Sequence, residues 1–194
     1  SSCEGSKISD KDRQKFLEYH NEARRRIAKG SEPNMNSAKN MYKLKWDCWL
    51  ERKVDEVIQG CPSSAKVGGH LSQNIVRWNN VNGSIIRPSM LVKLTLASWW
   101  RAGERYGVPS SQEYNNEKLT TFANMAYSKA SRVGCSYVAC GNSITLSCLY
   151  NAKWVEYSRW QRSDMGDWSC MHKGRRVHDL WQFWMRRRSV HGWY

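Results

Sequence analysis

Cysteine and histidine are the residues of this chain best suited to redox or metal chemistry. The chain has seven Cys and five His. The Cys are Cys3, Cys48, Cys61, Cys135, Cys140, Cys148 and Cys170, and the His are His20, His70, His172, His178 and His191. The spacings give no paired C-x-x-C knuckles and the His are scattered, so disulfides are favoured over a zinc site. Disulfides predict a secreted protein in an oxidising, extracellular compartment, with one Cys left over.

The length and composition fit one globular domain. A chain of 194 residues is long enough for a sizeable core and too short to predict two domains. No run approaches about 18 apolar residues, so we expect no membrane-spanning segment. The sequence starts with Ser1-Ser2-Cys3, without Met or an apolar leader, so we expect that any signal peptide has already been removed.

The chain has a net charge of +14, which limits the classes of molecule that it is expected to bind. It is typical either of a solvated basic surface or of a surface that attracts heparan sulfate, anionic lipid or nucleic acid. Lys and Arg are spread along the chain and no nucleic-acid-binding motif accompanies them, so we expect no nucleic-acid partner.

Helical and strand patterns alternate along the first 150 residues. Ser9, with Asp10 and Asp12, predicts the start of a helix that ends at Gly30. Further helices are predicted over 38–58, 91–100 and 118–129, and strands near 74–76 and over 133–140 and 144–150. Gly141-Asn142 predicts a hairpin turn between the last two strands. The order predicts an α+β layered domain.

Six segments in register carry a resemblance to a known family. They are residues 16–24 (FLEYHNEAR), 41–51 (MYKLKWDCWLE), 72–75 (SQNI), 121–127 (TFANMAY), 133–135 (VGC) and 146–151 (LSCLYN). Together they resemble the CAP superfamily (cysteine-rich secretory, antigen 5, pathogenesis-related 1), and within it the activation-associated secreted proteins of nematodes. The resemblance implies a CAP domain over residues 1–152, folded as an α-β-α sandwich with a large cleft.

The resemblance also implies the disulfide pattern. The family pairs the equivalents of Cys61 with Cys140 and of Cys135 with Cys148, and its nematode members suggest Cys3 with Cys48. Cys170 is then the odd cysteine. Asn82-Gly83-Ser84 is a candidate glycosylation sequon.

The cleft of many family members holds two His and two Glu that bind a divalent metal, and this sequence departs from that set. The first His falls near Ala65, with His70 as a displaced candidate. The other positions fall on Gln73, on Ala102 (with Glu104 out of register) and on Thr121. We therefore expect these to be degenerate cleft positions, with no metal, no cofactor and no enzymatic activity. The hydroxyls of Ser72 and Thr121 have no evident base beside them in the sequence, and His20, on an apolar stripe, is read as a buried structural residue.

The functional expectation follows from the resemblance. A nematode subgroup with a degraded cleft motif, which includes hookworm inhibitors of neutrophils and platelets, is associated with integrin antagonism. It implies a secreted, non-enzymatic host-interaction protein that blocks a platelet or leukocyte integrin, through the cleft rim or loops 60–70 and 106–117. The alternative is a secreted lipid- or sterol-binding CAP protein. The sequence has no Arg-Gly-Asp or Lys-Gly-Asp, so another surface must bind.

Residues 153–194 form an atypical tail. They hold six of the eleven Trp and an excess of five positive charges, from nine Lys or Arg against four Asp or Glu. Read one nucleotide later, every Trp codon gives Gly and Met171-His172 gives Cys, which resembles the Gly- and Cys-rich tail of nematode members. The hypothesis is a frame-shifted tail, to which Cys170 belongs; the alternative is a divergent basic, Trp-rich tail.

Overall fold

A computed structural model describes residues 3–33, 35, 37–38, 40–64, 67–81, 85–108 and 116–153. The elements in chain order are α1 (Asp10–Ala28), β1 (Lys45–Trp46), α2 (Cys48–Val57), β2 (Ser72–Asn79), α3 (Pro88–Trp100), α4 (Ala102–Tyr106), a 3-10 turn η1 (Glu117–Leu119), α5 (Thr120–Ala126), β3 (Arg132–Cys140) and β4 (Ser143–Tyr150). The predictions for Ala65, Asn82, Cys170 and all of the tail except Lys153 lie outside the described residues.

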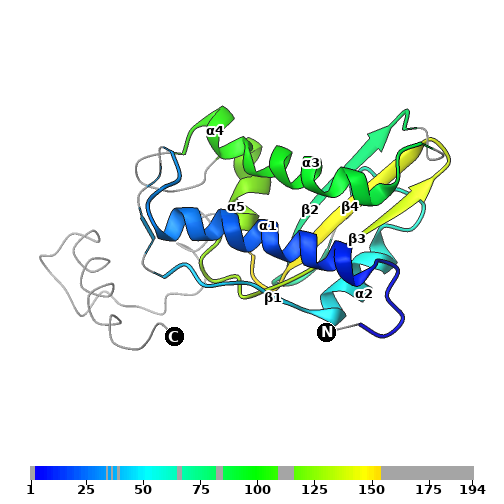
Figure 1. Ribbon diagram of the computed structural model, residues 1–194, viewed down its shortest axis with the longest axis horizontal. Helices are drawn as coiled ribbons and strands as arrows, with labels where there is room; N and C mark the ends of the chain where they lie inside the picture. Colours follow the sequence, from blue (N-terminus) through cyan, green and yellow to red (C-terminus); the bar gives the residue numbers. More distant parts are fainter. Residues whose placement is uncertain are drawn as a thin grey trace, which may run out of the picture. The chain divides into compact units, whose positions relative to one another are not determined.

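Four strands form one mixed sheet in the order β1-β3-β4-β2. β1 pairs with β3 in parallel, and β4 pairs with both β3 and β2 in antiparallel register. Figure 1 shows α1 and α3 running side by side over one face of the sheet, with α2 apart from them. The expected α-β-α sandwich is confirmed.

Each face of the sheet has its own apolar core, because side chains alternate along a strand. The larger core joins α1, α3 and α5 to the sheet, and includes Phe16, Leu96, Phe122, Leu146 and Tyr150. The smaller core lies under α2 and includes Leu50, Val54, Ile58, Leu71 and Leu149. The strand β4 contributes side chains to both cores, and every one of its residues is buried.

Helix α1 starts as the sequence predicts, with the Ser9 hydroxyl accepting the backbone N–H of Asp12 at 3.1 Å. Its buried Arg24 reaches beneath α5. The Arg24 guanidinium donates to the carbonyls of Tyr42, Met125 and Tyr127, each at 2.9 Å, and to that of Ala130 at 3.1 Å. One side chain thus satisfies the carbonyls at the end of α5 and fixes where that helix stops.

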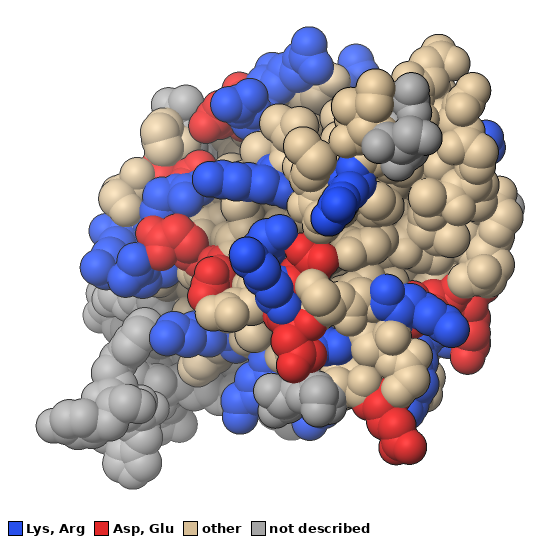
Figure 2. Space-filling model, turned by 45° about the vertical axis from the view of Figure 1, so that its right-hand side comes forward, with Lys and Arg blue, Asp and Glu red and all other residues tan. Residues whose placement is uncertain are grey.

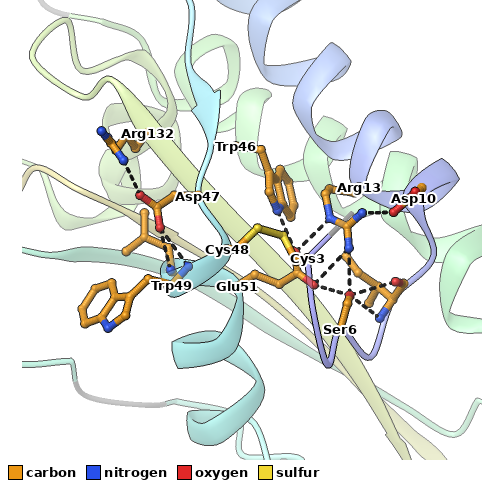
Figure 3. Close-up of a disulfide and its surroundings, with 12 residues drawn as sticks. Cys3, Ser6, Asp10, Arg13, Trp46, Asp47, Cys48, Trp49, Glu51 and Arg132 are labelled. Carbon is orange, nitrogen blue, oxygen red and sulfur yellow. Dashed lines mark hydrogen bonds and ion pairs between the residues drawn. A yellow bond between two sulfur atoms is a disulfide. The ribbon is translucent and has the colours of Figure 1, made fainter. Parts of the chain in front are cut away.

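The N-terminal segment is fastened to α2 by a disulfide and a polar cluster (Figure 3). Cys3 is bonded to Cys48, the first residue of α2. Beside it the buried Glu51 carboxylate accepts Nε of Arg13 at 2.9 Å and Nε1 of Trp46 at 2.7 Å, as well as the hydroxyl of Ser6. A buried carboxylate is tolerated here because it is paired and hydrogen-bonded.

The prediction of one helix over 38–58 is wrong in its first half. Lys45 and Trp46 form β1, opposite Arg132 and Val133 of β3. The helix begins only after Asp47, whose carboxylate accepts the backbone N–H groups of Trp49 and Leu50. A long-range strand pairing therefore overrides the local helical pattern. The predicted fourth helix is likewise shorter, since α5 ends at Ala126.

The structure contains the three disulfides that the resemblance implies, Cys3–Cys48, Cys61–Cys140 and Cys135–Cys148. They close loops across 45, 79 and 13 residues of separation. Each restricts the unfolded chain, by about 2–4 kcal/mol in typical cases. None of the helices in the described part of the chain is long and apolar enough to cross a membrane.

Candidate binding hollow

A hollow of about 700 Å³ opens where the end of α3, α4 and the start of α5 meet. We call it the α4 hollow. It is lined by Ser98, Trp99, Arg101, Ala102, Glu104, Arg105, Tyr106, Lys118 and Thr121. The elements can meet this closely because Gly103 lies against Phe122, whose ring would stand 2.8 Å from any Cβ at position 103. The hollow thus depends on a glycine in α4.

A hydrogen bond from a side chain to a backbone carbonyl helps to hold the wall of the α4 hollow. The Thr121 hydroxyl donates to the carbonyl oxygen of Trp99 at 3.2 Å, which ties the first turn of α5 to the last turn of α3. Trp99 and Ala102 are buried beneath the opening. Since the Thr121 hydroxyl proton is engaged by a carbonyl, and since no histidine lines the hollow among the described residues, Thr121 has no base to activate it there.

The charge of the α4 hollow is mainly positive. Of the described residues that line it, Arg101, Arg105 and Lys118 are basic and Glu104 alone is acidic, and all four side chains are exposed. The Lys118 ammonium lies 5.5 Å from the centre of the Tyr106 ring, and the Arg105 guanidinium lies 6.0 Å from it. Cations stacked on an aromatic ring keep a defined place while their charge faces the solvent. The hollow therefore suits an acidic ligand better than a cation.

The degenerate cleft positions are only partly brought together. Ala102, Glu104 and Thr121 line the α4 hollow. Gln73 does not: it lies opposite Leu149 in the sheet, on the face that packs against α2, and its Nε2 donates to the Ser147 hydroxyl at 3.0 Å.

His70 is exposed, just before β2, and does not line the hollow. Among the described residues, no three His, Cys, Asp or Glu gather closely enough to hold a metal ion. The expectation that the protein binds no metal stays a prediction.

A chain of buried hydrogen bonds runs beneath the α4 hollow from α1 to α5. His20 Nδ1 lies 2.7 Å from the carbonyl oxygen of Phe16, so it must carry the proton, and Nε2 accepts the Tyr150 hydroxyl at 2.9 Å. Asn74 Nδ2 donates to the Tyr150 hydroxyl at 3.2 Å and to the carbonyl of Thr121 at 2.8 Å. The chain couples the wall of the hollow to the centre of the fold.

The His20 ring is held neutral within this chain of bonds. Burial lowers the pKa of His20 to about 4, and the charge of Arg24 acts in the same direction. Asn124 extends the chain by donating to Asn74 Oδ1 at 2.9 Å. Sequence reasoning placed His20 correctly but missed Tyr150, Asn74 and Asn124 as its network. The sequence indicates these network residues only by placing polar side chains within otherwise apolar segments.

The family of the chain follows from comparison with known proteins. The model of the CAP family, described as the cysteine-rich secretory protein family, matches residues 17–150. The chain belongs to the CAP family. The matched region contains α1 from Leu17 onward, all four strands, and the helical segments α2, α3, α4, η1 and α5.

Two relatives of this CAP chain are similar over most of its length. "Ancylostoma secreted protein" of Ancylostoma caninum is 43% identical over 153 residues, which is 77% of this chain and 36% of the relative. The solved structure of Na-ASP-1 is 42% identical, with a TM-score of 0.73, over 77% of this chain and 38% of that one. The chain thus spans little more than a third of the length of these relatives.

A more distant likeness concerns the fold alone. The solved structure of hookworm platelet inhibitor has a TM-score of 0.59 at 21% identity, over 77% of this chain and 74% of that chain.

Proposed function

We propose that this CAP domain is a secreted, non-catalytic recognition domain whose α4 hollow binds an acidic surface of a host adhesion receptor of the integrin class. The observation that carries the proposal is the charge of the hollow. Arg101, Arg105 and Lys118 surround an opening in which two positions that the family resemblance assigns to metal ligands are Ala102 and Thr121. A site of this kind attracts carboxylates and offers no ligand set to a metal.

The extracellular location of the proposed encounter is supported by two observations. Three disulfides staple the domain, and such bonds persist in oxidising compartments. The relative from Ancylostoma caninum is named as a secreted protein. A protein that inhibits platelets shares this fold, so the fold is compatible with action on a blood cell.

The experiment adds the purified chain to adhesion assays of platelets and of leukocytes on integrin ligands. We expect the wild type to reduce adhesion and the double variant Arg105→Glu, Lys118→Glu to lose at least about tenfold in potency, because like charges would then repel an acidic partner. The matched control is Lys11→Glu, Arg52→Glu, which reverses two exposed cations on α1 and α2.

Three outcomes would contradict the proposal. The first is no effect of the wild type on either cell type, and the second is equal potency of the hollow variant and the wild type. The third is stoichiometric lipid or sterol extracted from the natural protein without any effect on adhesion, which would favour the lipid-carrier alternative.

A further inference from the structure

Helix α3 has an outer face that combines apolar and basic side chains. Its buried residues, Leu91, Val92, Thr95, Leu96, Trp99 and Trp100, occupy the side that meets the core. At the helical repeat, the opposite side carries Arg87, Met90, Lys93, Leu94, Ser98 and Arg101, and all six are exposed. We call these six residues, with Ile85 just before the helix, the α3 outer face.

The apolar part of this face is unusual for a surface. Met90 and Leu94 are 61% and 59% exposed and lie four residues apart, so their side chains are neighbours on the helix. Ile85 is 71% exposed. Three of the six large hydrophobic residues exposed in the described part of the chain therefore fall within residues 85–94. Apolar side chains gathered in this way mark an interaction surface rather than random exposure.

The charged part of the face has a single sign. Arg87, Lys93 and Arg101 make no salt bridge within the described residues. Moreover, the sequence contains no Asp or Glu from Val57 to Gly103. The cations of the α3 outer face are thus not neutralised by their own segment.

A space-filling view shows how charged side chains are distributed on one side of the molecule (Figure 2). Figure 2 turns the side on which β2 and β3 end and α3 begins towards the viewer. Acidic and basic side chains are interspersed over the lower and left parts of this view, whereas a broad area at its upper right has few charged side chains. On this side of the molecule, a region with few charges therefore lies beside a mixed one.

We propose that the α3 outer face docks on the surface of an anionic lipid bilayer. Ile85, Met90 and Leu94 would enter the boundary between headgroups and acyl chains, and the three cations would lie at the level of the lipid phosphates. Apolar residues combined with cations and no acid are the composition of interfacial helices that bind such membranes. Ser98 and Arg101 also line the α4 hollow, whereas Arg87, Met90, Lys93 and Leu94 do not. The proposal does not depend on a receptor, since the residues changed in its test lie outside the hollow and the partner is a different one.

A second copy of the chain is a poorer occupant of the same face. A two-fold dimer would place the same patch against itself, and the cations at its edge would approach their own copies. Like charges brought together in this way oppose association, whereas lipid phosphates neutralise them. The charge of the face therefore favours the bilayer.

The test is flotation of the full chain with phosphatidylcholine vesicles that do or do not contain phosphatidylserine. We expect binding only when phosphatidylserine is present, and weaker binding at high salt. Met90→Ser, Leu94→Ser should lower the partition coefficient about tenfold or more, because two apolar side chains no longer leave water. Arg87→Glu, Lys93→Glu should abolish binding. Tyr42→Ser, Lys43→Glu is the matched control at exposed sites elsewhere, and should bind as the wild type does.

The result can overturn the proposal in three ways. Absence of binding to phosphatidylserine vesicles would do so. Equal binding of the wild type and both α3 variants would also do so, because the charge of other segments would then explain the adsorption. A dimer in solution that Met90→Ser, Leu94→Ser converts to monomers, with no vesicle binding, would assign the face to a second copy instead.

Discussion

The hydroxyl of Tyr150 donates a hydrogen bond to Nε2 of His20 across 2.9 Å, joining the last strand to the first helix over 130 residues of sequence. His20 is fully buried and its Nδ1 proton is bound by the carbonyl of Phe16. The ring can accept no second proton without losing the Tyr150 bond. This makes the fold sensitive to acid at one identifiable residue.

The first prediction is a loss of stability between pH 6.5 and pH 4. The folded-state pKa of His20 is about 4, against 6.5 for an ordinary histidine, so the unfolded chain binds the proton more readily. The contribution of the neutral ring is complete above the unfolded pKa and is lost as pH falls towards the folded pKa, by an amount on the order of 3 kcal/mol. Urea unfolding across this range measures it.

His20→Gln is the variant that tests this assignment. It should be less stable than the wild type near neutral pH, yet its stability should change less between pH 6.5 and pH 4. His70→Gln is the matched control, because His70 is exposed, and it should keep the pH dependence of the wild type. An unchanged slope in His20→Gln would show that another group carries the effect.

The second prediction concerns Arg24. Arg24 is 1% exposed, and its guanidinium donates to four backbone carbonyls, with no carboxylate partner among the described residues. Lysine has a single ammonium group in place of the planar guanidinium with its several N–H donors. Arg24→Lys should therefore leave buried carbonyls unpaired and reduce the free energy of unfolding by about 3 kcal/mol. Arg25→Lys, on the exposed side of α1, should change it by less than about 0.5 kcal/mol.

The third prediction concerns the close contact between β3 and α2. A Cβ added at Gly134 would stand 2.3 Å from the backbone nitrogen of Glu51 and 2.6 Å from the Leu50 carbonyl carbon. Backbone atoms cannot yield as a flexible side chain does, so Gly134→Ala should destabilise the protein by about 3 kcal/mol. Gly141→Ala, with open space around it, separates this clash from backbone strain alone, since Gly141 has a φ of 54°. A small effect at Gly134 would contradict the geometry.

Local signals predicted the parts of this fold that depend on neighbouring residues. Ser9 caps α1 as its sequence indicates, and Gly141 turns the β3–β4 hairpin. The extended segment at Lys45 and Trp46 was missed because it is stabilised by pairing with Arg132 and Val133, far along the chain. A helical pattern carries no information about such a partner.

The residues of the candidate site also separate into those that the sequence could predict and those that it could not. Ala102 and Thr121 could be placed by resemblance, and both line the α4 hollow. The orientation of Gln73 could not be predicted, because a shift of one residue in strand register moves a side chain to the other face of the sheet. The cationic lining was also missed, since Arg101, Arg105 and Lys118 come together only when α4 folds beside η1.

The fourth prediction concerns the tail. If residues 153–194 are a frame-shifted reading, the natural protein will yield Gly- and Cys-rich peptides after residue 152. Mass spectrometry of peptides from the natural protein, together with resequencing of the transcript, measures this directly. The control is peptide coverage of residues 1–152, which should match the sequence as printed. Natural peptides that match 153–194 as printed would end the hypothesis.

The fifth prediction is that zinc finds no specific site. Among the described residues that line the α4 hollow, Glu104 is the one carboxylate, and it stands beside Arg101, Arg105 and Lys118, whose charges oppose a divalent cation. Ala102 offers no ligand atom, and the Thr121 hydroxyl proton is donated to the Trp99 carbonyl. His70 lies outside the hollow, and in the described part of the chain it belongs to no group of three side chains that could hold a metal ion.

Calorimetric titration with zinc should therefore show no stoichiometric binding with sub-micromolar affinity. His70→Ala serves as the comparison, and its titration should be indistinguishable from that of the wild type. A tight site that disappears in His70→Ala would mean that the loop before β2 rearranges to bring His70 beside Glu104. In that case the positive charge of the hollow would not decide its ligand, and the proposed preference for an acidic receptor surface would lose its physical basis.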